Sequence, residues 1–164
     1  MSTDTNQKSM SIIVTKGSLD WAYPPFILAS TAAAMDVPVT LFFTFYGLAL
    51  LKKKLDLKIS TLGNPAMEMP MMGGHMKMPA LAGMLPGVDT MATSMMKSLI
   101  AKKGVSPIEE LRDNCVEFGV RMIACQMTLD LFDYKREDMI DGLEYAGAGT
   151  YIGTALDSHI NLFI

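Results

Sequence analysis

The sequence predicts an α/β protein in which helices cover both faces of a mainly parallel five-stranded sheet. Short β-rich segments alternate with helical segments along the 164 residues, a pattern typical of parallel sheets. The segment 37–44 (VPVTLFFT) is apolar at almost every position, as expected of a central strand that is covered on both faces. We therefore expect a single three-layer α/β/α sandwich, which the chain length suits.

The individual elements follow from apolar runs and their boundaries. We expect strands at 10–15, 37–44, 119–124, 143–146 and 159–164, and a short strand or extended connection at 57–62. We expect helices at 19–35, 45–54, 90–103, 106–118, 126–132 and 148–158, and a helical turn at 137–140. Pro24 and Pro25 predict that the regular part of the first helix begins after them, near Phe26.

A methionine-rich insertion at about 64–90 interrupts this pattern. It has four prolines, four glycines and no clear periodicity, and long loops of this kind are usually functional. Its methionines, with His75, could bind Cu(I) through soft thioethers, but their irregular spacing favours packing or an interface. We expect a disordered tail at 1–9 and a single domain at 10–164 that contains the insertion.

Composition excludes several classes of protein. The net charge is −3 and no basic patch is interleaved with aromatic residues, which argues against nucleic-acid binding. The apolar stretch 37–51 is shorter than the roughly 20 residues of a membrane span, so we do not favour membrane association. Two cysteines without a C-x-x-C pair or a secretory signal indicate free thiols in a cytoplasmic protein.

Cys125 is the leading candidate for chemistry. It follows a short apolar strand and precedes a helix, and a helix N-terminus favours a thiolate over a thiol. The carboxyl ends of parallel strands share one edge, so Lys16, Gly17, Thr44 to Gly47 and Gly147 to Gly149 should gather near this thiol. The alternative is that Cys125 is a small buried hydrophobic residue.

Cys115 lies ten residues earlier, in the preceding helix. A strand from Gly119 to Cys125 spans about 20 Å, which places the two cysteines beyond the ~7 Å between α-carbons that a disulfide allows. A structural role for Cys115 is favoured, while a second thiol acting across a subunit interface stays open.

Four motifs together resemble the DsrE/DsrF-like superfamily, in particular the DsrE-like "peroxiredoxin-like" branch of sulfur-oxidising prokaryotes. They are IIVTKGSLD at 12–20, LFFTFYGL at 41–48, GVRMIACQM at 119–127 and GLEYAGAGTYI at 142–152. The resemblance covers nearly the whole chain after the N-terminal tail. It implies a three-layer fold, a homo-oligomer and a role in cytoplasmic sulfur trafficking.

The resemblance also implies particular site residues. Cys125 matches the cysteine that carries sulfur as a persulfide or thiosulfonate and exchanges it with TusA-like carriers, and Cys115 is a candidate second thiol. Lys16, Gly17 and Gln126 are the expected contacts of a sulfur anion or polysulfide, with no metal or cofactor required. Whether the protein is a sulfurtransferase or a carrier stays open.

One alternative belongs to a different class. The methionine-rich segment could mark a non-catalytic oligomeric protein that docks on a membrane or redox complex, with or without bound copper. A thiol peroxidase is disfavoured because the chain lacks a P-x-x-x-T-x-x-C element.

Overall fold

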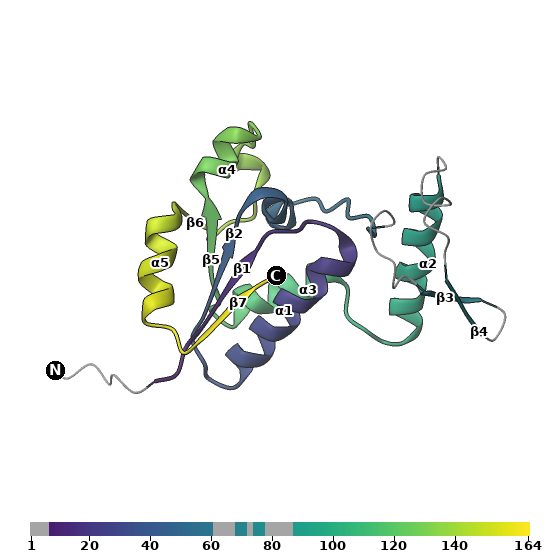
Figure 1. Ribbon diagram of the computed structural model, residues 1–164, viewed down its shortest axis with the longest axis horizontal. Helices are drawn as coiled ribbons and strands as arrows, with labels where there is room; N and C mark the ends of the chain where they lie inside the picture. Colours follow the sequence, from purple (N-terminus) through teal and green to yellow (C-terminus); the bar gives the residue numbers. More distant parts are fainter. Residues whose placement is uncertain (1–6, 61–67, 72–73, 78–86) are drawn as a thin grey trace. The chain divides into compact units, whose positions relative to one another are not determined.

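The computed structural model describes residues 7–60, 68–71, 74–77 and 87–164 (Figure 1). The chain divides into two compact units. The first contains Met1–Gly17, Trp21–Leu55 and Ile108–Ile164, and the second contains Ser18–Asp20 and Asp56–Pro107.

The first unit is built on a five-stranded sheet with the order β6-β5-β2-β1-β7. All neighbouring strands are parallel, which confirms the predicted α/β class and its parallel sheet. The strands are β1 (Met10–Val14), β2 (Val39–Phe43), β5 (Arg121–Cys125), β6 (Glu144–Ala146) and β7 (Ile160–Phe163). Every residue of the central strand β2 is buried, as its continuous apolar character predicts.

Helices cover the two faces of this sheet in separate layers (Figure 1). The ring of Phe43 lies 5.9 Å from that of Phe26 in α1, whereas the ring of Phe42 stacks on Tyr151 in α5 at 5.0 Å. Successive strand residues point to opposite faces, so α1 and α5 cover opposite sides. The helices of the first unit are α1 (Leu19–Ala34, without its first two residues, which belong to the second unit), α3 (Ile108–Glu117), α4 (Gln126–Leu131), α5 (Ala148–Leu156) and the 3₁₀ helices η1 (Phe45–Leu51) and η3 (Arg136–Asp138).

Two of these helices differ from their predicted extents. α1 begins at Leu19 and contains both prolines. Its first turn is held by a hydrogen bond to a residue outside the helix, in which the Leu19 N–H donates to the carbonyl oxygen of Lys58 at 2.8 Å. The predicted helix 45–54 is a shorter 3₁₀ helix that ends at Leu51.

The second unit contains α2 (Val88–Lys102) and an antiparallel hairpin of β3 (Glu68–Met71) and β4 (Gly74–Lys77). The hairpin was not predicted, because its sequence shows no apolar alternation. Residues 57–60 form an extended connection without an assigned strand. Of the methionines considered above as alternative copper ligands, Met67, Met72, Met78 and Met84 lie outside the described residues. In the described part of the chain, no helix combines the length and apolar character needed to cross a membrane.

Candidate functional site

Three elements begin at the carboxyl edge of the sheet, each immediately after a strand. η1 follows β2, α4 follows β5 and α5 follows β6. α4 starts at Gln126, which makes Cys125 both the last residue of β5 and the N-cap of α4. The thiol therefore lies at the junction of a strand and a helix that its sequence predicts.

The side chain of Cys125 packs on the α5 face of the sheet. It belongs to a buried cluster with Phe42, Ile123 and Tyr151, and only 3% of its surface is exposed. Cys125 and Ile123 are two residues apart on β5 and so point to the same face. One side of the thiol is therefore apolar and closed to water.

The other side of the thiol is polar. Thr128, in the first turn of α4, is fully buried, and its hydroxyl oxygen lies 3.2 Å from that of Thr44. The same Thr128 oxygen accepts the backbone N–H of Phe45 at 3.1 Å. Phe45 has a φ of 48°, a left-handed conformation that is rare for a bulky residue and is held here by its surroundings.

These polar groups decide the ionisation of Cys125. Burial acts to raise the pKa of its thiol. The hydroxyl and N–H of Thr128, the hydroxyl of Thr44 and the N–H of Met127 act against burial and outweigh it, so the pKa is lowered. The Cys125 side chain makes no capping hydrogen bond to α4. A lowered pKa increases the fraction of the nucleophilic form at neutral pH.

Cys115 occupies a different environment. It is fully buried, its thiol donates to the carbonyl oxygen of Phe26 at 3.6 Å, and both cysteines are free. Burial raises the pKa of Cys115 to about 12. Cys115 faces α1, whereas Cys125 packs with Tyr151 of α5, so the two thiols lie on opposite sides of the sheet.

The other predicted site residues contact neighbouring protein groups. The ammonium of Lys16 lies 3.1 Å from the ring centre of Trp21, a cation–π contact. Gly17 packs against the backbone of Tyr46. Gln126 donates to the Asp130 carboxylate at 2.7 Å, and its carbonyl oxygen accepts from Arg136 at 2.5 Å. Their role toward a sulfur anion stays a prediction.

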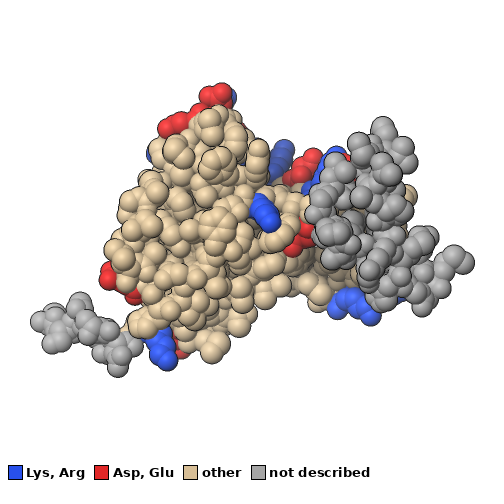
Figure 2. All heavy atoms as spheres, in the orientation of Figure 1, with Lys and Arg blue, Asp and Glu red and all other residues tan. Residues whose placement is uncertain are grey.

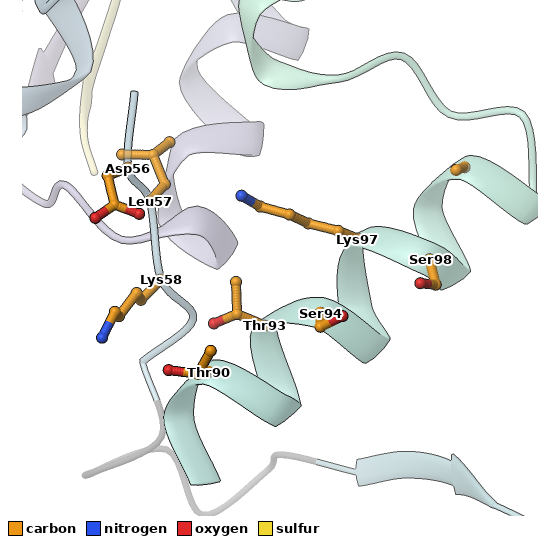
Figure 3. A pocket seen from close by; sticks show the side chains of 9 residues that line it. Asp56, Leu57, Lys58, Thr90, Thr93, Ser94, Lys97 and Ser98 are labelled. Carbon is orange, nitrogen blue, oxygen red and sulfur yellow. The ribbon is translucent and has the colours of Figure 1, made fainter. Parts of the chain in front are cut away.

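Each unit has a cavity among its described residues. One, of about 480 Å³ in the second unit, lies between Asp56–Lys58 and α2, from which Lys97 extends toward that connection (Figure 3). The other, of about 460 Å³ in the first unit, is lined by Lys52 to Lys54, residues 133–135 and residues 137–139. Neither lining includes a cysteine. Within the described ranges, no three His, Cys, Asp or Glu side chains are grouped to hold a metal ion.

Sequence reasoning placed Thr44 at this edge of the sheet but missed Thr128 as a member of the site, and it did not predict that the two hydroxyls meet. They are 84 residues apart and meet only because the ends of β2 and β5 are neighbours. The local signal for Thr128 was its position three residues after Cys125, which precedes the helix. The third residue of a helix faces the side chain of the N-cap residue.

The fold and the thiol define a class: three-layer α/β/α proteins with a cysteine at the carboxyl edge of a parallel sheet. Comparison with known proteins identifies the family of the chain. The chain belongs to the DsrE/DsrF/DrsH-like family, whose model matches residues 6–163.

Two relatives match almost the whole chain. Sulfur carrier protein DsrE2 of Allochromatium vinosum is 58% identical over 158 residues, which cover 96% of this chain and 99% of that protein. Protein YrkE of Bacillus subtilis is 33% identical over 163 residues, which cover 96% and 97% of the two chains.

Two solved structures share the fold. The ychN protein of E. coli superposes with a TM-score of 0.55 over 96% of this chain and 99% of its own. BT1422 of Bacteroides thetaiotaomicron superposes with a TM-score of 0.53 over 99% and 100%. Both are 10% identical to this chain and support the fold alone.

Proposed function

We propose that this protein is a sulfur carrier that holds sulfur on Cys125. The observation that carries the proposal is the position of this thiol at the junction of β5 and α4, with polar groups on one side, which lower its pKa, and an apolar cluster on the other. Its 58% identity to sulfur carrier protein DsrE2 gives independent support. Sulfur transfer needs a thiolate nucleophile and a second thiol, without a metal or a base triad.

Two loading reactions suit the site. In the first, the Cys125 thiolate attacks the outer sulfur of a persulfide R–S–SH, forms Cys–S–SH and releases R–S⁻. In the second, it attacks an inner sulfur of tetrathionate, forms the thiosulfonate Cys–S–S–SO₃⁻ and releases thiosulfate. The low exposure of Cys125 favours small donors such as these.

Intact-mass spectrometry tests the assignment. After incubation with polysulfide or tetrathionate, the wild-type protein should gain the mass of the transferred group. Cys125→Ser should abolish the gain, and the matched variant Cys115→Ser should keep it. A gain that survives Cys125→Ser and disappears in Cys115→Ser would assign the chemistry to Cys115 instead.

We place the protein in the cytoplasm and expect a TusA-like carrier as its exchange partner. Mixing sulfur-loaded protein with such a carrier and weighing both proteins tests this step, because one should lose the mass that the other gains. If sulfur loads on Cys125 but is not passed to the TusA-like protein, the result would contradict this partner and would not contradict the sulfur-carrier role of Cys125.

A homo-oligomer is also part of the proposal. Large apolar side chains are exposed on α5 and β7, with Leu156 at 81% and Phe163 at 73%, and Figure 2 shows few charged residues on the displayed face of this unit. Exposed apolar surface of this kind is typical of interfaces. Leu156→Glu should reduce the mass found by light scattering, whereas Met35→Glu, in the turn that follows α1, serves as the exposed apolar control.

A further inference from the structure

The outer edge of β7 carries open backbone groups in the part of the chain that the structure describes. β7 is the last strand of the sheet and lies beside β1 (Figure 1). The N–H groups of Ile160 and Ile164 donate toward the β1 side, at 3.2 and 2.9 Å. Because alternate residues of a strand direct their N–H and C=O groups to opposite edges, those of Asn161 and Phe163 point away from β1. Among the described residues, no hydrogen bond satisfies these four groups.

β7 also lacks the features that usually protect an open strand edge. Natural edges are commonly blunted by lysines, prolines or bulges, whereas residues 160–164 have the sequence INLFI, without a charged residue or a proline. The side chains of Ile160 and Phe163 are 45% and 73% exposed. An uncharged edge with open donors and acceptors is suited to pairing with another strand.

The flank of α5 that lies toward β7 is apolar as well. Thr154 marks the flank nearer β5, because its hydroxyl accepts a hydrogen bond from Arg121 of β5 at 2.9 Å. Ile152 and Leu156 are each two residues from Thr154, which places them about 160° around the helix, on the flank toward β7. Both side chains are more than half exposed. This flank therefore offers apolar surface next to the open strand edge.

Phe163 lies on the same face of the sheet as α5. The Ser11 hydroxyl lies 3.0 Å from that of Tyr151 in α5, and it is also hydrogen-bonded to the side chain of Asn161. Asn161 and Phe163 are two residues apart and so point to the same face. The exposed apolar side chains of β7 and α5 and the strand edge together offer about 500 Å² per copy, which reaches the lower limit of roughly 1,000 Å² for a specific interface between two copies.

We propose that two copies of this chain join edge to edge through β7, with the two strands antiparallel, so that two sheets of five strands become one sheet of ten. In this pairing Asn161 of each copy exchanges two hydrogen bonds with Phe163 of the other, and the four bonds satisfy the open groups of both edges. An inverted copy of the same edge fits because each of the two residues supplies one donor and one acceptor, which makes the interface self-complementary. The two-fold axis also brings the apolar flanks of the two α5 helices to the same side of the sheet. The pairing rests on the homo-oligomer proposed above and is independent of the sulfur-carrier role.

The pairing separates the two Cys125 thiols. Antiparallel β7 strands direct the carboxyl edges of the two sheets to opposite ends of the assembly. Three strand spacings lie between β5 and β7 in each copy and one more joins the copies, so the two Cys125 residues are about 34 Å apart across the sheet. The two thiols therefore act independently and cannot form a disulfide with each other.

A pair of variants tests the backbone hydrogen bonds separately from the side chain. Phe163→Ala and Phe163→Pro both remove the ring, but only proline removes the outward N–H, and proline is tolerated on an edge strand. Light scattering over a dilution series gives the dissociation constant of the oligomer. Phe163→Ala should weaken the oligomer by about tenfold through lost apolar contact. Phe163→Pro should weaken it by about 30-fold more, because each pair of copies loses two hydrogen bonds.

Hydrogen exchange of single amides tests the pairing in the unmodified protein. The N–H groups of Asn161 and Phe163 should be protected at concentrations that favour the oligomer and should exchange faster on dilution. The N–H of Ile160 is the internal control, because it donates to the carbonyl oxygen of Ser9 within one copy and should keep its rate. Protection of the two outward amides that does not depend on concentration would overturn the pairing and assign the edge to another segment of the same chain.

Engineered cysteines test the position of the two-fold axis. In a background of Cys115→Ser and Cys125→Ser, Leu162→Cys should cross-link two copies under mild oxidation. The axis passes between the two Leu162 positions, whose α-carbons are about 4.5 Å apart in a pair of this kind, within reach of a disulfide. Ile160→Cys is the matched control on the same face of β7 and should not cross-link, because its two copies lie about 13 Å apart along the strands.

Equal dissociation constants for Phe163→Ala and Phe163→Pro, or cross-linking as strong in Ile160→Cys as in Leu162→Cys, would overturn the edge pairing. An oligomer whose outward amides exchange freely would also overturn it, and would leave the homo-oligomer in place with a different interface. A wild-type protein that stays monomeric throughout the dilution series would overturn both proposals.

Discussion

Gly17 and Tyr46 approach so closely that a β-carbon on Gly17 would lie 2.3 Å from the Tyr46 carbonyl oxygen. A second close contact joins the same two segments: a β-carbon on Gly47 would lie 2.2 Å from the carbonyl oxygen of Val14. The end of β1 and the 3₁₀ helix η1 therefore interlock through two glycines. Since η1 begins with Phe45, this interlock also supports the turn that contacts Thr128.

The interlock predicts that Gly47→Ala and Gly17→Ala destabilise the protein by about 1–3 kcal/mol, because backbone must move to make room. Urea denaturation measures the change. Gly153→Ala is the matched control: it lies in α5 with open space around it, and alanine should stabilise that helix by about 0.5–1 kcal/mol. Wild-type stability in Gly47→Ala would show that the contact is not tight.

The two thiols should differ in reactivity toward iodoacetamide. Cys125 should be alkylated with a midpoint below the ordinary value of 9.0, since its pKa is lowered. Cys115 should stay unmodified until the protein is unfolded, because it is buried and its pKa is raised to about 12. Peptide mass mapping across pH 6 to 9 distinguishes the two, and alkylation of Cys115 before Cys125 would contradict the assignment.

Cys115 should also make stability fall at high pH. Its folded pKa of about 12 exceeds the ordinary value of 9.0, so the unfolded chain loses its proton first and the stability present below pH 9 is lost as the pH rises toward 12. Between pH 8 and 10 the unfolding free energy of the wild type, relative to Cys115→Ala, should fall by about 1.4 kcal/mol. A constant difference across this range would show that the thiolate is tolerated in the fold.

Arg112 should be important for stability although it is remote from the thiol. It is 4% exposed, and one of its guanidinium nitrogens donates to the carbonyl oxygens of Leu50 at 3.0 Å and Lys52 at 2.7 Å. Arg112→Met would leave these carbonyls without their donor and should cost about 2–4 kcal/mol. Arg121→Met, which removes an exposed ion pair with Glu144, should cost under about 1 kcal/mol. Equal costs would show that burial does not strengthen the Arg112 contacts.

The fold could be predicted because its main signals are local. The continuous apolar run of β2 and the glycines and N-caps that end or begin helices each depend on a few neighbouring residues. Tertiary contacts overrode them in two places. Leu19 N–H bonded to Lys58 lets α1 start before Pro24, and the close approach of Gly47 to Val14 accompanies a tight 3₁₀ helix where an α-helix was expected.

The position of Cys125 could also be predicted, but its chemical environment could not. A strand followed by a helix places the thiol at the sheet edge, and this is visible in a dozen residues. The pKa is lowered by Thr128 and by Thr44, and Thr44 follows a different strand, β2. The contacts of Lys16 with Trp21 and of Gln126 with Arg136 likewise depend on packing that no short motif encodes.

The pairing of β1 with β7 has a consequence for folding during synthesis. Met10 is aligned with Ile160, and the side chains of Ser11 and Asn161, 150 positions apart, are hydrogen-bonded. One edge of β1 therefore stays unpaired until β7 has left the ribosome, after nearly all of the described chain has been made. Contacts of such long range form slowly, and open strand edges invite aggregation. The sheet that carries the thiol is thus completed only after β7 has been translated, and a nascent chain would gain from a chaperone until then.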